Sequence, residues 1–435
     1  MAQNLIACDR DQQLLLPPDM REWLPDDHLA WFVLEAVEEL DLGGFYAAYR
    51  DDGQGGAAHD PAMMVALLLY AYAVGETSTR AIERRAIEEV AFRVIAANQR
   101  PDHTTISRFR ARHAEALAEL FSQILALCER AGLLQRGPLA LDGTKLRANA
   151  SLGANRTPEQ IRAEVEAWLR ESEETDRRED ELYGDRRGDE LPAHLADRGS
   201  RREALRRAKA ELDAEQAARA AEHAELRRRH EEHLEQTGRR LRGRPPGPKP
   251  PKRRGNERRN LTDPESRVVR DKGSLVQGYN AQALVSEGQI IISAELTNEA
   301  NDTRLLEPMV TAAAEHLGPR PRVLADNGYW NVAQIGALRR QGIEAIVSPR
   351  GARPRGPRTR VGPEVERMDR LLETPEGAAL YGLRKQIVEP VFAQIKHLRG
   401  LNRLARRGLA ASQAEWKLIA ATHNLLKLYR APQAA

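Results

Sequence analysis

The sequence predicts an α/β domain with a mixed sheet flanked by helices, an all-helical N-terminal domain, and a long charged helical insertion. Short apolar runs that stop on an acidic residue are the first observation behind this prediction. They end at Asp142, in Leu139–Gly143, and at Asp326, in Val323–Gly328. Such a run is typical of a buried strand, here one that delivers a carboxylate to the edge of a sheet.

The order of the other predicted elements is the second observation. Residues 279–285 and 290–294 predict a hairpin with a turn at Ser286–Gly288, and a short strand is expected at Val268–Val269. After residue 300, predicted strands alternate with predicted helices. Early antiparallel strands followed by strand–helix–strand crossovers predict an RNase H-like mixed sheet with helices on both faces.

The length of the chain predicts more than one domain. Its 435 residues exceed what one compact core usually holds, so two to three domains are expected. We assign residues 1–135 to a helical domain, and residues 136–150 with 261–435 to the RNase H-like domain. Residues 151–260 form the charged helical insertion with its basic, proline-rich linker.

The composition excludes several classes of protein. An apolar fraction of 41% is enough for globular cores, and a net charge of +3 argues only weakly for a polyanionic partner. Cys8 and Cys128 have neither CxxC nor Cys/His spacing, so no zinc site or disulfide framework is expected. No stretch approaches the ~18 apolar residues of a membrane span, and residues 1–17 lack the pattern of a secretory signal. We therefore expect a cytoplasmic protein without membrane contact.

Residues from about 18 to 135 have apolar residues at helical spacing. Asp60-Pro61 has the pattern of an N-cap followed by a first-turn proline. Another helix start is expected at 103–113, after a short turn. Its front carries three basic residues, Arg108, Arg110 and Arg112. This pattern of a helix, a short turn and a second, basic helix is typical of a helix-turn-helix DNA-binding domain. The alternative is an ordinary helical bundle with a solvated basic face, but the nearby hydroxyl groups, suited to phosphate contacts, favour DNA.

The insertion has a different character. A long helix is expected from about 201 to 235, but its seven-residue apolar repeat is interrupted, so a self-sufficient coiled coil is not expected. Ten basic residues and one acidic residue lie between Arg239 and Asn260. Proline and glycine there exclude a regular element. The segment, Arg253 and Arg254 included, is suited to follow a phosphate backbone. The alternative is a solubilising linker. A second basic loop lies at 350–360.

Asp142, Asp326 and Glu389 together predict a carboxylate cluster. Oxygen ligands suit Mg²⁺, and two such ions about 3.5–4 Å apart are a common device for phosphodiester chemistry. Pro390 follows Glu389, so a helix is either kinked there or begins there. We favour the kink, because the apolar stripe continues on both sides. Asp302 is expected to cap a helix near residue 305.

These segments resemble the DDE transposases of bacterial insertion sequences, over nearly the whole chain. The resemblance rests on Leu141–Thr144, on Ala325–Tyr329 and on residues 381–396. Many members of that family carry a Tyr, Arg, Glu, Lys signature on the glutamate helix. Tyr381, Glu389 and Lys396 fit this signature, and either Arg384 or Lys385 takes the arginine place. The N-terminal helical region is also similar to the family's DNA-binding domain.

The resemblance implies a chemistry and partners. Asp142, Asp326 and Glu389 would bind two Mg²⁺ ions, with Mn²⁺ as a substitute, for hydrolysis and strand transfer. Lys396 would hold a phosphate beside the metals, the alternative being a surface lysine. Tyr381 and the basic residue would contact DNA. The partners would be double-stranded DNA, as terminal inverted repeats and target, with a homodimer in the DNA complex at the nucleoid.

Two other functions stay open. One is a transposase-derived DNA-binding protein that is no longer catalytic, and the set of three acidic residues speaks against it. The other is an RNase H-like nuclease that cuts without joining. The helix-turn-helix candidate and the two basic loops favour sequence-specific binding of element ends over that reading.

Overall fold

The computed structural model describes residues 19–49, 58–157, 220–236, 258–271, 273–349 and 362–431, with scattered residues between 159 and 218. Most of the predicted insertion, including Arg253 and Arg254, and the predicted basic loop at 350–360 lie outside the described residues. Residues 220–236 are helical, as expected for that part of the insertion. No helix in the described part of the chain is long and apolar enough to cross a membrane.

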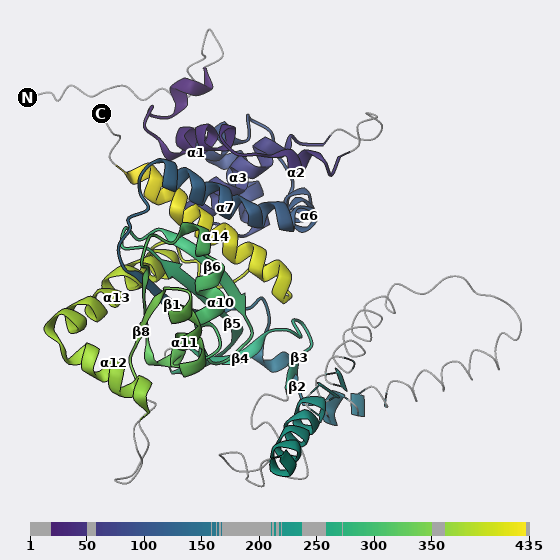
Figure 1. Cartoon of the computed structure of the whole chain (residues 1–435). Coiled ribbons are helices and arrows are strands. Elements are labelled where there is room, and N and C mark those ends of the chain that lie inside the picture. The colour runs from purple at the N-terminus through teal and green to yellow at the C-terminus, as the bar shows by residue number, and fades with distance from the viewer. Residues whose placement is uncertain are drawn as a thin grey trace, which may run out of the picture.

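The N-terminal region is all helical, as predicted (Figure 1). Capping side chains define several helix starts: Asp60 accepts from the N–H of Ala62 ahead of Pro61, and Asp102 accepts from the N–H groups of Thr104 and Thr105. The elements are η1 (Met20–Trp23), α1 (Leu29–Glu38), α2 (Gly43–Tyr46), α3 (Pro61–Ala73), α4 (Thr79–Glu88), α5 (Val90–Ile95), α6 (His103–Arg112) and α7 (Ala114–Arg130).

A mixed sheet forms the second half of the structure. Its strands are β1 (Leu139–Arg147), β4 (Arg267–Asp271), β5 (Ser274–Val285), β6 (Ile291–Thr297), β7 (Arg322–Ala325) and β8 (Glu344–Val347). The order is β4-β5-β1-β7-β8, and β6 pairs with the second half of β5. β5 is antiparallel to β1, whereas β1, β7 and β8 are parallel. The predicted RNase H-like fold class is confirmed. A separate small ladder joins β2 (Asn155–Arg156) to β3 (Arg259–Asn260).

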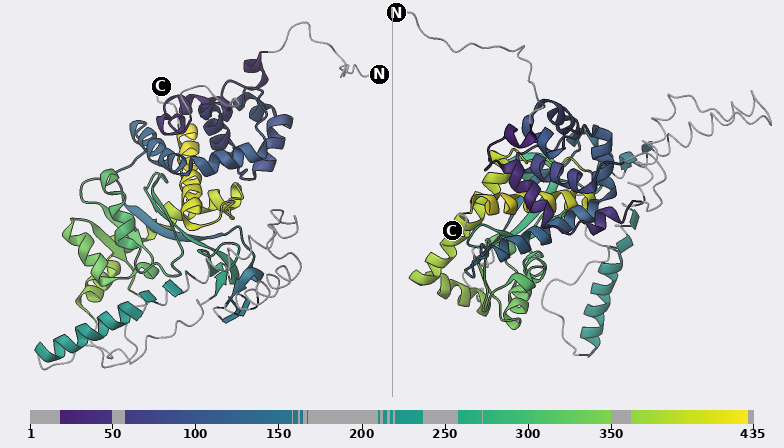
Figure 2. Two further views of the ribbon diagram at one scale, coloured as in Figure 1. Left: turned by 90° about the vertical axis from the view of Figure 1, so that its right-hand side faces the viewer. Right: turned by 90° about the horizontal axis from the view of Figure 1, so that it is seen from above.

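Helices surround this sheet (Figures 1 and 2). α13 packs against β1, β5 and β7, and α11 packs against β8. The later elements are α10 (Leu306–Thr311), α11 (Val332–Arg340), α12 (Pro363–Glu373), α13 (Pro375–Ala393), the π-helical turn η5 (Gln394–Leu398) and α14 (Leu409–Arg430). Short 3-10 turns are η2 (Leu152–Ala154), η3 (Ala314–His316) and η4 (Asn327–Tyr329).

Pro390 lies inside α13, so the helix runs through Glu389 and does not begin there, which excludes the less favoured of the two alternatives. A π-helical turn follows directly at Gln394–Leu398. One local prediction needs correction: Asp302 does not cap α10, whose N-cap is Leu305 without a side-chain hydrogen bond.

α14 joins the helical region to the sheet. It packs against α3 and α7 on one side and against β6 on the other, as Figure 2 shows for the yellow helix between the two layers. Its buried Trp416 donates to the carbonyl of Gln282 in β5 at 3.1 Å. One apolar core therefore runs from the N-terminal helices into the sheet. The division of the chain at residue 135 stays a prediction.

Glu415 on α14 is a buried carboxylate with four hydrogen bonds. It accepts from the hydroxyl of Tyr72 in α3 at 2.9 Å and from the backbone N–H groups of Ala405 and Arg406. Tyr72 in turn accepts from the guanidinium of Arg110 in α6 at 2.9 Å. The network links three helices and the loop that precedes α14.

We predict that Glu415→Ala lowers the free energy of unfolding by about 3 kcal/mol, because it leaves buried donors without an acceptor. Urea unfolding followed by circular dichroism measures the loss. The matched control is Glu119→Ala at an exposed site on α7, which should change stability by no more than about 0.5 kcal/mol. Equal effects of the two substitutions would show that the network does not stabilise the fold.

Candidate active site at the ends of strands β1 and β7

The pairing of β1 with β7 brings two predicted aspartates together. Leu141 lies opposite Ala325 in this parallel ladder, so the next residue on each strand is an aspartate at the same place in the sheet. Asp326 accepts from the N–H of Gly328 at 2.8 Å, and Asp142 accepts from the N–H of Gly143 at 2.8 Å. Each carboxylate is thus held by the backbone of its own turn.

α13 places a cation on this pair. The guanidinium of Arg384 lies 3.1 Å from a carboxylate oxygen of Asp142, and its side chain is only 12% exposed. Tyr381, one turn earlier, donates from its hydroxyl to the carbonyl of Ala325 at 3.3 Å. Lys385 is exposed. Of the two candidates for the signature arginine, the structure brings Arg384 to the aspartates.

Lys396 reaches the same strand from the π-helical turn. Its ammonium donates to the hydroxyl of Thr144 at 3.1 Å and to the carbonyl of Lys145 at 2.9 Å, and lies 3.7 Å from the carboxylate of Asp271. The side chain is 10% exposed, so it is not a freely solvated surface lysine. Arg384 therefore binds β1 at Asp142, and Lys396 binds it two to three residues further on.

Glu389 is not brought into this set. It is exposed on α13, next to the buried Val388. Among the residues that the structure describes, no three or more His, Cys, Asp or Glu side chains are placed to hold a metal ion. The two aspartates offer the oxygen donors that a hard divalent cation prefers. The assignment of Glu389 as a third ligand stays a prediction.

Asp302, which the sequence led us to expect as a helix cap, lies at the site instead. One carboxylate oxygen accepts from the side-chain amides of Asn280 at 2.6 Å and Gln282 at 2.9 Å. A Cβ on Gly328 would lie 3.5 Å from the other oxygen of Asp302 and 2.9 Å from the carboxylate of Asp326. Asp302 thus lies beside Asp326. The signal for it was present in β5, where two amide residues interrupt a buried strand.

The three aspartates change the electrostatics of their surroundings. Burial raises the pKa of Asp142 to about 6, helped by the charges of Asp326 and Asp302, while the Gly143 N–H and Arg384 act in the opposite direction. Burial is also the main cause that raises the pKa of Tyr329 well above its ordinary value, and the same three carboxylates add to it. A site that collects this much negative charge is suited to a cation.

The predicted DNA-binding arginines of α6 differ in their placement. Arg108 and Arg112 are exposed, and Arg112 stacks 4.7 Å over the ring of Tyr49. Arg110 is buried and donates to the Tyr72 hydroxyl and to the carbonyl of Thr77. Arg110 therefore has a structural role, and we remove it from the proposed DNA contacts. The helix-turn-helix assignment stays a prediction.

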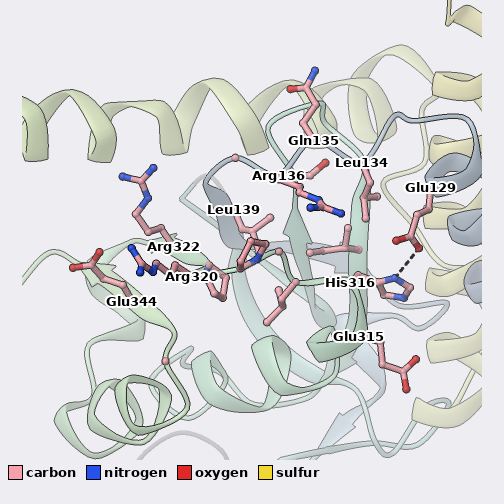
Figure 3. Close-up of a pocket in the computed structure, with 18 residues that line it drawn as sticks. Glu129, Leu134, Gln135, Arg136, Leu139, Glu315, His316, Arg320, Arg322 and Glu344 are labelled. Carbon is pink, nitrogen blue, oxygen red and sulfur yellow. Dashed lines mark ion pairs between the residues drawn. The ribbon is translucent and has the colours of Figure 1, made fainter.

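A cavity of about 740 Å³ lies at the opposite ends of the strands (Figure 3). Leu139, Arg322 and Glu344, at the starts of β1, β7 and β8, line it. Its basic and acidic residues balance: Arg136, Arg320 and Arg322 against Glu129, Glu315 and Glu344. This cavity is separate from the aspartates, and its balanced charge gives it no preference for an anion.

We predict that the stability of the protein depends on the protonation of Asp142. The folded-state pKa near 6 exceeds the ordinary 3.8, so the folded protein holds a proton that the unfolded chain releases. Raising the pH from about 4 to about 6 therefore lowers the free energy of unfolding, by at most about 3 kcal/mol from this group. Asp142→Asn should remove that part of the decrease. Urea unfolding in EDTA at each pH measures the free energy of unfolding of both proteins. If it depends on pH in the same way in the wild type and in Asp142→Asn, the prediction is contradicted.

Two family models match the chain. The Transposase DDE domain matches residues 258–425, which include Asp326, Glu389 and Lys396, and the Transposase domain (DUF772) matches residues 18–112. Asp142 lies between the two matches. Neither a curated protein nor a solved structure was found that matches the chain. With the mixed sheet and its helical N-terminal region, the two matches identify the chain as a DDE-type transposase of an insertion element.

Proposed function

We propose that this transposase binds the ends of its element and catalyses metal-dependent cleavage and strand transfer of DNA. The observation that carries the proposal is the parallel placement of Asp142 and Asp326, with Arg384 paired to Asp142 and Lys396 bound to β1 two to three residues further on. Two acidic side chains on neighbouring strands, with cations from α13 and η5 beside them, can receive both a metal ion and a phosphate.

Transposases with a DDE domain generally use divalent metal ions. Here Asp142 and Asp326 would hold Mg²⁺, with Glu389 as the proposed further ligand and Mn²⁺ as a substitute. When bound, two such ions activate a water or 3′-hydroxyl nucleophile and stabilise the leaving oxygen. Asp142 has to be ionised to serve as a ligand. Because its pKa is raised to about 6, metal affinity should fall as the pH drops through that value.

Lys396 of η5 and Arg384 of α13 would act on the phosphate. Lys396 is fixed by Thr144 and by the carbonyl of Lys145, so little conformational entropy is lost when a phosphate oxygen approaches it. Arg384 is paired with Asp142. A cation bound at Asp142 would compete with that pair and leave the guanidinium to contact the DNA backbone, next to Tyr381. Lys385, Arg108 and Arg112 are exposed and are proposed as further DNA contacts.

Strand transfer requires two element ends to be held together. A homodimer on double-stranded DNA would hold them. A nuclease that only cuts needs one end. The helical N-terminal region supports binding of a specific end sequence, which favours a transposase over a nuclease that cuts without joining.

The test is cleavage of a labelled duplex that carries the sequence flanking the gene. We expect nicking at the element end with Mg²⁺ and none with EDTA. Asp142→Asn, Asp326→Asn and Glu389→Gln should each lower the rate by more than about 100-fold, as removal of a ligand exceeds the effect of its supporting residues. Glu376→Gln, at an exposed site on the same helix as Glu389, is the matched control and should cleave normally.

The outcomes separate the three functions. Nicking followed by joined products in a strand-transfer assay supports the transposase. Nicking without joining would identify a nuclease, and tight binding without cutting would identify a DNA-binding protein that has lost catalysis. Normal cleavage by Asp142→Asn and Asp326→Asn would overturn the assignment of the site.

A further inference from the structure

A second hollow, of about 710 Å³, lies at the far end of strand β1. Its lining comes from the end of β1, from the start of β5 and from the loop between η5 and α14. We call it the β1-end groove and define it by Arg147, Arg403, Arg407, Leu152 and Leu275. None of these residues is among the predicted catalytic or DNA-binding residues.

The charge of the β1-end groove is of one sign. Arg147, Arg403 and Arg407 are all exposed, and the lining contains neither Asp nor Glu. The cavity at the other end of the strands also has three arginines, but three glutamates accompany them. Of these two hollows, the β1-end groove is therefore the one whose positive charge is not balanced by lining carboxylates. Such a surface is typical of a site that binds a polyanion.

Two of the three arginines are held in position. Asn149 accepts from Arg403 at 3.0 Å through its side chain and from Arg407 at 3.0 Å through its backbone carbonyl. Its side-chain amide donates to the carbonyl of Ala405 at 2.9 Å. The loop itself is joined to β1, because the backbone of Arg147 bonds to both Asn402 and Leu404. Guanidinium groups fixed in this way lose less freedom when they bind a phosphate.

Two exposed leucines complete the groove. Leu275 is 57% exposed and Leu152 is 44% exposed. A site for a small free anion has no use for such residues, whereas a nucleic acid strand presents sugars and base edges next to its phosphates. Apolar side chains placed beside arginines are a known device of proteins that bind DNA through its backbone and groove. The combination favours a DNA strand over an isolated phosphate.

The groove lies on the same strand as Asp142. Asp142 and Arg147 are five residues apart, which is about 17 Å at about 3.3 Å per residue. Lys396 contacts β1 between them. Successive phosphates of a DNA strand are separated by the axial rise of about 3.4 Å per nucleotide and also by the turn of the helix, so one strand can reach both places within a few nucleotides.

We propose that the β1-end groove binds the backbone of the DNA strand a few nucleotides from the phosphate that is cut at Asp142 and Asp326. The inference rests on the proposed function, since it measures the distance from that cleavage position. Arg403 and Arg407 would contact the phosphates, and Leu275 would lie against a sugar or a base edge. The groove would thus fix which phosphate reaches the aspartates.

The first test is the salt dependence of binding to the end duplex in EDTA, where no cleavage occurs. The plot of log Kobs against log salt has a negative slope. In the protein with both Arg403→Gln and Arg407→Gln, this slope should become shallower by about 2, or about 1 per lost phosphate contact. The matched control is Arg136→Gln with Arg322→Gln, the same charge change in the balanced cavity, and it should leave the slope unchanged. Equal slopes for both double variants would overturn the proposal.

The second test locates the contact on the DNA. Single neutral methylphosphonates are placed at each position from one to ten nucleotides from the cleavage site. For the wild-type protein, the weakening of binding should have one maximum, a few nucleotides from the cleavage site, and the Arg403→Gln, Arg407→Gln protein should show no such maximum. A maximum that stays in the double variant would contradict the assignment.

The third test keeps all arginines, so it does not depend on whether the double variant folds normally. The photo-crosslinker benzoylphenylalanine is placed at Leu275, or as a control at Val332, which is 53% exposed on α11. Light should join the first protein to DNA at the positions where the methylphosphonates weaken binding most, and the second should join less than about a tenth as much. Absence of crosslinks at Leu275 in a protein that still cleaves would overturn the groove alone. Crosslinks at Leu275 without any cleavage would instead count against the catalytic function.

Discussion

Parallel pairing of β1 with β7 is the constraint on which the site depends. The register that sets Leu141 opposite Ala325 also sets Asp142 beside Asp326, and a shift of one residue would turn one of the two side chains to the other face of the sheet. The apolar residues before each aspartate are fully buried. The hydrophobic core therefore fixes the register, and the register fixes the spacing of the carboxylates. Burial beside this core raises the pKa of Asp142, and the charges of Asp326 and Asp302 add to the effect. A bound cation would offset this electrostatic cost.

α13 and α14 extend this constraint to the rest of the molecule. α13 delivers Arg384 to β1, η5 delivers Lys396, and the loop that follows η5 is joined to the end of the same strand. α14 then packs between the sheet and the N-terminal helices, with Glu415 and Trp416 as buried anchors. The helical region that we propose to bind DNA is thus attached to the sheet with the aspartates by a continuous core.

The sheet could be predicted from the sequence because its signals are local. Short apolar runs predict the buried strands that lead to Asp142 and Asp326. Two further apolar runs joined by a glycine-containing turn predict the hairpin between 279 and 294. The continuation of the helix through Pro390 could be predicted from the apolar residues on both sides, and Val388 and Val391 are indeed fully buried. The π-helical turn that follows could not be predicted, because no local pattern of the sequence indicates it.

Other features depend on tertiary contacts that no spacing reveals. Arg110 was predicted to face DNA with Arg108 and Arg112, yet the neighbouring helix α3 supplies Tyr72 as its buried partner. Asp302 is near the site only because Asn280 and Gln282 hold it there. The β1-end groove joins residues from three segments that lie far apart in the sequence. The position of Glu389 is not explained by any contact of the described residues.

The most direct test of the central claim is to ask where a divalent cation binds. Iron(II) with ascorbate produces hydroxyl radicals at its binding site, and these cut the chain nearby. If Asp142 and Asp326 share a cation site, cuts should occur close to residues 142 and 326, should disappear with excess Mg²⁺, and should be lost in Asp142→Asn. Cuts confined to other parts of the chain, or a pattern unchanged in that variant, would contradict the account.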